Sequence, residues 1–417
     1  MRVRLETSRL ANGLEVLAVE HRRAPIVAIA VLYHVGSQDE LPSQAGLAHV
    51  VEHLAFGTSA YLAREEFDQY CTDAGGTNNA MTTYSYTLYH MVVPAYQLPL
   101  GLWLEASRLR GLLFTDEEFA TQQSVILEEL NETVYNQPYG QWRDVQAQQG
   151  FAPECSYHWE VHGVPESVAA LTPNDARAFV RHYYRPDNAV LVICGDVEAD
   201  YALELAQEAF AEIEACREPI PRPEWRESCR RSGVRAVVED AVPLPAVFLS
   251  FHCGGYSASG FLHQQALAEV LGGGRSSRLY RRLLLGGVAA ETSAFLDARE
   301  WSSLLTCYGV AAGPEVSAEQ LEEALWQTLH ELIAQGIAES ELEKVRHRLM
   351  TASAVLLQSP LGIAEEVALG AMFWGDPERP FRILDEYARI TVEELTEVGR
   401  SIFRPDNAVT TIVLPRA

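Results

Sequence analysis

The chain has 417 residues, enough for two or three domains of roughly 150 residues each. Hydrophobic residues make up 48% and charged residues 21%, which excludes disordered, collagenous and disulfide-stapled chains. The formal net charge of −25 makes nucleic acids and anionic membrane surfaces poor partners.

The N-terminal residues and the cysteines bear on the cellular compartment in which the protein is expected. Charged residues recur through the first twenty positions, so no signal peptide can be drawn there, and no later stretch reaches the roughly 20 apolar residues that cross a bilayer. The seven cysteines are odd in number and include no CxxC pair, which favours a reducing compartment. We therefore expect no membrane association and a cytoplasmic location, or a periplasmic one if a leader has been removed.

Apolar periodicity and Gly or Pro breaks predict a mixture of strands and helices in the first half. Helices do not alternate strictly with strands, so the pattern predicts an α+β fold with an antiparallel sheet packed with helices. In chain order, we expect strands near 13–20 and 26–35, helices near 45–57 and 63–74, strands near 77–84 and 86–93, helices near 95–111, 116–135 and 172–183, and a strand near 188–195.

An internal repeat divides the chain into two related modules. The segment from Leu171 to Val190 matches the segment from Ile390 to Val409 at a constant offset of 219 residues, with six consecutive identities. In each copy, a Thr that can cap a helix is followed by the helix, an Arg-Pro turn and a β-branched strand. The proline-rich stretch 219–224 lies between the copies and resists both helix and central strand. We predict domains at 1–215 and 233–417, with a linker at 216–232.

The most informative motif is the five-residue stretch from His49 to His53, with Glu52 inside it. On an α-helix, positions i and i+4 differ by about 40° and i+3 lies about 60° to the other side, so the three side chains share one face. Two imidazoles at this spacing suit zinc, and the carboxylate between them can take a proton from water. The competing interpretation is a pair of helix histidines that only pack against their neighbours.

The order HxxEH resembles the inverted zinc motif of the pitrilysin or insulinase (M16) metallopeptidase family. The resemblance covers nearly the whole chain and includes residues 33–40, 46–58, 75–82, 125–130 and 272–280. The two-module length is similar to the short-chain branch (M16B), which includes mitochondrial processing peptidase and bacterial relatives. The resemblance implies two related modules per chain, with the metal site in the first, and chains that pair into a clam-shaped dimer.

The resemblance also implies a third zinc ligand on a downstream helix. That residue is Glu129, which lies 76 positions after His53, whereas Glu128 is one helical step off the face. Two turns earlier, the family usually places another glutamate that supports the site, and this chain has Gln122 there. Gln122 can orient a ligand or water by hydrogen bonding but adds no negative charge. We therefore expect metal affinity or turnover to be lowered.

The family binds peptide as an added strand on a sheet edge. Asn79 and Ala80, in a small-residue strand after a Gly-Gly turn, are the substrate contacts that the resemblance implies. An ordinary edge strand without a ligand is the alternative.

The second module lacks two features of active relatives. Its candidate stretch, residues 263–267, has neither the carboxylate nor the second imidazole of the metal motif. Active members also carry an Arg and, seven residues later, a Tyr that grip the peptide, but Leu284 and Glu291 stand at these positions. Starting instead from Arg282 places Ala289 at the tyrosine position, so neither alignment restores the pair.

These observations predict a zinc endopeptidase or oligopeptidase acting on unfolded peptides. His49, His53 and Glu129 hold Zn²⁺, Glu52 is the general base, and a related partner subunit supplies the missing Arg and Tyr in a heterodimer or higher heteromer. Two alternatives remain open: a self-sufficient homodimeric peptidase, and a non-catalytic scaffold subunit of a larger complex.

Overall fold

The computed structural model describes residues 3–416, which form two compact units, each built around one sheet. Neither unit is continuous in sequence. Unit 1 takes the residues up to Glu129, then Glu160–Glu224 and Ser353–Arg382. Unit 2 takes Leu130–Trp159, Trp225–Ala352 and the residues from Ile383 onward. The predicted ranges 1–215, 216–232 and 233–417 are continuous. They differ from these units, because residues 130–159 of the first half belong to unit 2 and residues 353–382 of the second half belong to unit 1.

The sheet of unit 1 has six strands in the order β1-β2-β6-β3-β5-β4, so β4 is an edge strand. The strands are β1 (Leu5–Arg9), β2 (Glu15–Glu20), β3 (Ile26–Tyr33), β4 (Thr77–Thr82), β5 (Thr87–Pro94) and β6 (Ala189–Gly195). Its helices are α1 (Leu47–Leu54), α2 (Glu66–Asp73), α3 (Leu98–Arg110), α4 (Asp116–Leu130), α6 (Pro165–Ala170), α7 (Pro173–Tyr183), α8 (Ala199–Phe210) and α12 (Pro360–Trp374).

The sheet of unit 2 has five strands in the order β7-β11-β8-β10-β9. The strands are β7 (Val234–Asp240), β8 (Ala246–His252), β9 (Ala289–Asp297), β10 (Leu304–Ala311) and β11 (Ala408–Pro415). Its helices are α5 (Trp142–Gly150), α9 (Phe261–Gly272), α10 (Ala318–Gln335) and α14 (Val392–Ile402), while α11 (Glu339–Leu356) and α13 (Arg379–Arg389) each run across a boundary between the two units.

The predicted α+β class is confirmed, but neither sheet is purely antiparallel. The pairs β2–β6 and β7–β11 are parallel, and the other neighbours are antiparallel. The reason is topological: β2 and β3 run in opposite directions, and so do β7 and β8. A later strand that inserts between two opposed neighbours must be parallel to one of them, and β6 and β11 each do so.

The repeat predicted from the sequence has the same local structure in both copies. Thr172 caps α7 by accepting a hydrogen bond from the Asp175 N–H, and Thr391 caps α14 by accepting one from the Glu394 N–H. Each helix leads through a short 3₁₀ turn into β6 or β11, the strand that inserts into its sheet. The predicted sequence of capped helix, turn and strand is therefore confirmed.

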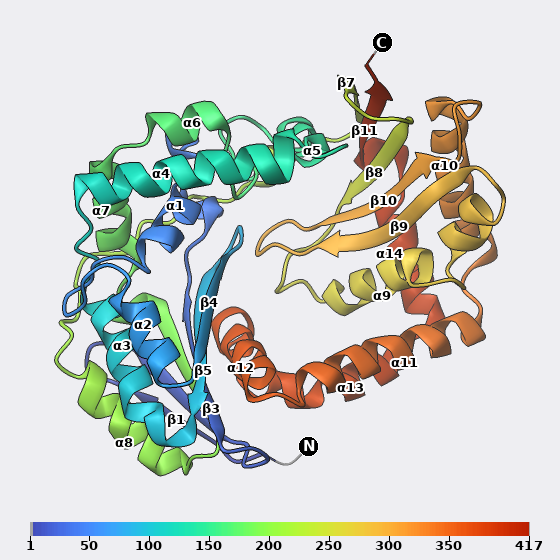
Figure 1. Ribbon diagram of the computed structural model, residues 1–417. Coiled ribbons are helices and arrows are strands. Elements are labelled where there is room, and N and C mark those ends of the chain that lie inside the picture. Colours follow the sequence, from blue (N-terminus) through green and yellow to red (C-terminus); the bar gives the residue numbers. More distant parts are fainter. Residues whose placement is uncertain (1–2, 417) are drawn as a thin grey trace. The chain divides into compact units, whose positions relative to one another are not determined.

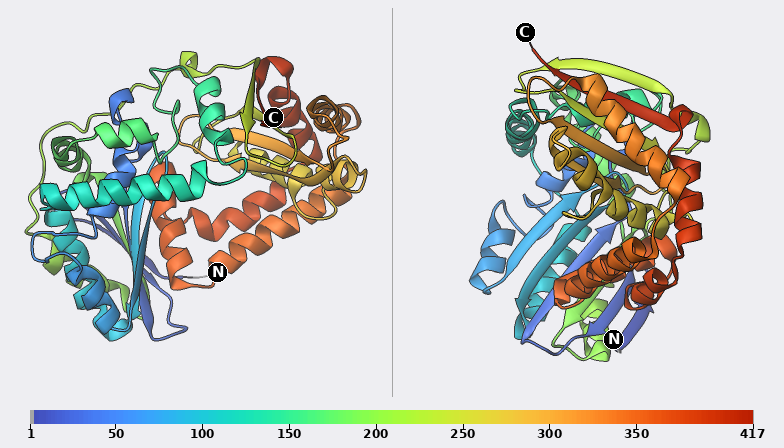
Figure 2. Two further views of the ribbon diagram at one scale, coloured as in Figure 1. Left: turned by 45° about the horizontal axis from the view of Figure 1, so that its top comes forward. Right: turned by 90° about the vertical axis from the view of Figure 1, so that its right-hand side faces the viewer.

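Each unit contains a helix that comes from the other half of the chain. Helices α3 and α8 lie against one face of the first sheet, and α12, from the second half of the chain, covers β3 and β6 on the other (Figure 1, Figure 2). In unit 2, α5 from the first half packs against β11 and β7. The core under α12 includes the fully buried Ile363, Ala364 and Val367. Within residues 3–416 no single helix has the length and apolar character to cross a membrane, although α11 and α12 meet both criteria if joined across the bend between them.

Candidate metal centre

Helix α1 begins at a glycine and is capped by a buried carboxylate. Gly46 precedes the helix with φ of 95°, a conformation that favours glycine. Glu40 accepts hydrogen bonds from the backbone N–H groups of Gly46 (3.0 Å) and Ala48 (2.7 Å), and only 3% of its surface is exposed. A carboxylate at a helix N-terminus satisfies orphan donors and complements the helix dipole. Glu40 therefore fixes the start of the helix that carries the HxxEH motif.

Three of the predicted site residues converge in unit 1. His49 and His53 lie one turn apart on α1, with ring centroids 4.8 Å apart, and Glu129 comes from α4. The His53 Nε2 atom is 3.6 Å from a carboxylate oxygen of Glu129, and one ligand atom from each residue lies within 4.8 Å of the others. In the part of the chain that the structure describes, this is the one such group of at least three His, Cys, Asp or Glu residues.

The donor set fits a divalent metal. Two imidazoles and one carboxylate are typical protein ligands of a zinc ion that keeps a further position open. Burial, followed by the neighbouring imidazoles of His53 and His162, lowers the pKa of His49 to about 4, so this ring is neutral near pH 7 as a metal ligand must be. The buried Nδ1 atom of His49 has no hydrogen-bond partner among residues 3–416. Buried polar atoms usually have a partner, and this one belongs to a residue of the metal-type cluster.

Glu52 lies on the same helix between the two histidines, and this helix packs against β4. Burial raises the pKa of Glu52 above its usual value, and the nearby Glu129 carboxylate adds to this, while Thr82 and His53 oppose it. A carboxylate with a raised pKa is better matched to proton transfer near neutral pH.

Gln122 lies on α4, two turns before Glu129, and its side chain makes no hydrogen bond to any described residue. It lines a small pocket together with Leu54 at the end of α1 and Glu118 on its own helix. The Glu118 carboxylate accepts hydrogen bonds from the Thr58 hydroxyl (2.6 Å) and the Thr115 N–H (2.7 Å). The structure thus places Gln122 beside α1 without giving it a metal-ligand partner.

Asn79 and Ala80 lie in the middle of β4, at the open edge of the first sheet. Burial alternates along this strand, with Asn79 exposed and Ala80 partly buried. The Asn79 side chain accepts a hydrogen bond from the Ala80 N–H at 2.9 Å. That N–H therefore carries a local partner that a docked strand would have to replace.

The corresponding parts of unit 2 carry no such centre. The stretch 263–267 lies in α9, and no metal-type cluster occurs there among the described residues. Leu284 ends a short π-helical segment, and Glu291 lies on β9, where it accepts a hydrogen bond from the Tyr308 hydroxyl at 2.7 Å.

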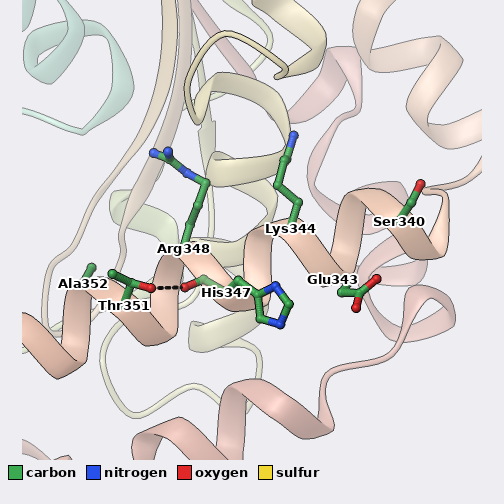
Figure 3. Close-up of a pocket in the computed structure, with 7 residues that line it drawn as sticks. All are labelled: Ser340, Glu343, Lys344, His347, Arg348, Thr351 and Ala352. Carbon is green, nitrogen blue, oxygen red and sulfur yellow. Dashed lines mark hydrogen bonds between the residues drawn. The ribbon is translucent and has the colours of Figure 1, made fainter.

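A separate pocket lies along one face of α11 in unit 2 (Figure 3). Lys344 and Arg348 point to the same side of this helix in the figure, but both have partners: Lys344 bonds Ser276, and Arg348 pairs with Glu269 at 2.8 Å. None of the predicted site residues lines this pocket.

Sequence reasoning assigned no role to Glu40, although it lies in a stretch that carries the resemblance. Glu40 could have been found as an acidic residue shortly before a predicted helix.

Comparison with known proteins gives matches along most of the chain. Residues 15–143 match the family model described as "Insulinase (Peptidase family M16)", and residues 170–349 match the one described as "Peptidase M16 inactive domain". The three metal-type residues and Glu52 lie in the first matched region.

Individual relatives align over nearly their whole length. The chain is 27% identical to a protein named "Zinc protease PqqE" from Helicobacter pylori, over 98% of this chain and 93% of that protein. It is 24% identical to "Uncharacterized zinc protease YmxG" from Bacillus subtilis, over 96% of each. Among solved structures, a protease from Helicobacter pylori superposes with a TM-score of 0.94 at 26% identity, covering 99% of this chain and 100% of that one.

Proposed function

Because the chain belongs to peptidase family M16, we propose that it is a zinc-dependent endopeptidase, or the zinc-bearing subunit of one, that cleaves unfolded peptides. One observation carries the proposal: His49, His53 and Glu129 offer three ligand atoms within 4.8 Å, beside the partly buried Glu52 carboxylate on helix α1. The names of the relatives, which call them zinc proteases, support zinc as the metal.

When bound by these three residues, zinc would polarise the scissile carbonyl and make an attacking water more acidic. Glu52 takes the proton from that water and can return it to the leaving amine. Its raised pKa and its position between the two imidazoles support this role. Burial around His49 keeps the ring neutral, so that its nitrogen remains available as a donor.

Substrate peptide would pair with the free edge of β4 near Asn79 and Ala80. An edge strand recognises the backbone of an extended peptide, so it accepts many sequences. The absence of Arg and Tyr at Leu284 and Glu291 supports a heteromer in which a related partner supplies both groups; a self-sufficient homodimer is the alternative.

The test uses the protein isolated through an affinity tag from the organism that makes it, so that any partner is retained. We expect about one zinc per chain by elemental analysis and cleavage of quenched fluorescent peptides. Glu52→Gln is expected to keep zinc but to lose activity by roughly 100- to 10,000-fold, since it removes the base without removing a ligand. An active Glu52→Gln protein, or a metal-loaded wild type that cleaves no peptide, would overturn the proposal. The second result would favour the non-catalytic scaffold.

A further inference from the structure

We propose that Arg108 is a positioning residue that fixes the C-terminal end of helix α1, and with it His53 and Glu52. This inference rests on the proposed function, because it assigns Arg108 a role in holding the same metal centre. Arg108 lies on α3 and is only 2% exposed, and its Nε atom donates to the carbonyl of Ala55, directly after α1, at 3.1 Å.

The end of α1 depends on this contact. The Phe56 N–H donates to the His53 carbonyl at 3.3 Å, and the Ala55 carbonyl, two residues further on, accepts from the Arg108 side chain. The last carbonyls of a helix have no partner within the helix, and a cation beside them complements the helix dipole. Because α1 has only eight residues, it relies on contacts with its surroundings. Without Arg108, the turn that carries His53 would loosen.

Three aromatic rings and one carboxylate hold the Arg108 guanidinium. Its Cζ atom lies 4.2 Å from the ring centroid of Phe67, 4.3 Å from that of Tyr89 and 5.1 Å from that of Phe56, all within the range of cation–π contacts. Its Nη1 atom donates to both carboxylate oxygens of Glu105, at 2.7 and 2.5 Å. Because a guanidinium is planar and its donors form a fixed fork, these contacts define the direction in which Nε points.

The surroundings of Arg108 are anchored apart from the metal centre. Phe67 comes from α2 and Tyr89 from β5, while α3 packs against β3 and β5. The chain that leaves α1 is tied to α3 as well, since the hydroxyl oxygens of Ser59 and Ser107 lie 2.8 Å apart in a hydrogen bond. Arg108 thus refers the end of α1 to the first sheet and α3.

The two ends of α1 are therefore held by different groups. Glu40 binds the N-terminal end, and Arg108 binds the end that carries His53. A metal site works only when its ligands stay within about 0.5 Å of the productive geometry. Movement of the C-terminal turn would shift His53 relative to His49 and Glu129, so we expect Arg108 to control metal affinity.

The test removes the Arg108 contact without leaving a buried charge unpaired. Glu105→Leu combined with Arg108→Met replaces the ion pair by apolar side chains, a change that folded proteins often tolerate. With protein isolated as above, we expect the dissociation constant for zinc to rise by roughly 10- to 100-fold, the usual range for losing a group that supports metal ligands. At saturating zinc, kcat should fall and KM should stay near the wild-type value, because Glu52 lies in the loosened turn and the β4 edge is unchanged.

The matched control is Asp187→Leu combined with Arg185→Met. Arg185 is also buried, pairs with Asp187 at 2.6 Å and donates to the Cys216 carbonyl at 3.2 Å. Neither of these partners lies in α1. We expect the zinc affinity and the kcat of this control to match those of the wild type.

Two further readouts separate positioning from a general loss of stability. When Co²⁺ replaces zinc, its visible absorption reports the arrangement of the ligands, and the bands should shift in the paired variant at positions 105 and 108 but not in the control. Hydrogen exchange of the metal-free protein should become faster at residues 51–57 and stay unchanged in the strands of the first sheet.

Wild-type zinc affinity with an unshifted Co²⁺ spectrum in the paired variant, or an equal loss of affinity in the control, would overturn the positioning role. If the paired variant does not fold, Arg108→Lys decides in its place, because an ammonium group lacks the fixed fork of donors. Weaker zinc binding by folded Arg108→Lys protein supports the role, and wild-type binding overturns it. A wild type that binds zinc but cleaves nothing would refute the proposed function, while zinc affinity and hydrogen exchange still decide the role of Arg108.

Discussion

The cap on helix α1 yields a prediction whose size follows from the structure. Glu40→Gln replaces one of the two carboxylate oxygens by an NH₂ group, so one of the N–H donors of Gly46 and Ala48 loses its acceptor. A hydrogen bond to a charged group contributes about 1.5–3 kcal/mol, and removal of the charge from a partly buried helix N-terminus costs up to about 2 kcal/mol more. We expect a local destabilisation of α1 by about 2–4 kcal/mol, which corresponds to roughly 30- to 900-fold more frequent opening.

Hydrogen exchange measured on the zinc-free protein suits this prediction, because a chain with two compact units need not unfold in one step. Peptides that cover α1 should lose protection in Glu40→Gln. The matched control is Glu66→Gln, since Glu66 accepts a similar bond from the Ala63 N–H at 2.8 Å, but this bond is exposed to solvent at the start of α2. Glu66→Gln should destabilise α2 by less than about 1 kcal/mol. Unchanged protection of α1 in Glu40→Gln, or a loss no larger than that of the control, would refute the capping argument.

Three further predictions concern charge and metal. Gln122→Glu should change turnover, upward by roughly tenfold, without abolishing zinc binding; complete loss of zinc would show that the assignment of this position is wrong. Burial lowers the pKa of His252 in unit 2 from 6.5 to about 4. As the pH drops through this range, the unfolded chain binds a proton that the folded unit does not bind, so the stability of the folded unit falls. In His252→Gln, the decline of the zinc-free protein's Tm between pH 7 and pH 5 should be shallower, and an unchanged slope would contradict the assignment. Removal of the metal with a chelator should abolish peptide cleavage, and added Zn²⁺ should restore it; activity that survives metal removal would contradict a zinc mechanism.

Local patterns predicted the elements that carry the site, but not their partners in space. The helix predicted at 45–57 is α1 at Leu47–Leu54, and the helix predicted at 116–135 is α4 followed by a π-helical segment at Asn131–Tyr135. The spacing from His53 to Glu129 indicated a residue that the structure does place beside the imidazoles. These features depend on periodicity and on residue type, which a single sequence displays.

The features that were missed depend on contacts between distant segments. In the first half of the chain, helices α5, α6 and α8 and strand β1 were not assigned; α5 and α6 are short, at nine and six residues. The insertion of β6 between β2 and β3 and the exchange of α5 and α12 leave no trace in local periodicity, because pairing and packing partners are chosen by the whole fold. The packing of α1 against β4 likewise joins segments that are distant in sequence.

The central claim is that His49, His53 and Glu129 share one metal ion, and a paired substitution tests it most directly. Zinc content is measured by elemental analysis in Glu129→Gln and in Glu128→Gln, which makes the same chemical change one residue away at an exposed position. The account predicts about one zinc per chain in the wild type and in Glu128→Gln, and a loss of most of it in Glu129→Gln. Equal zinc content in the two variants, or none in the wild type, would contradict it.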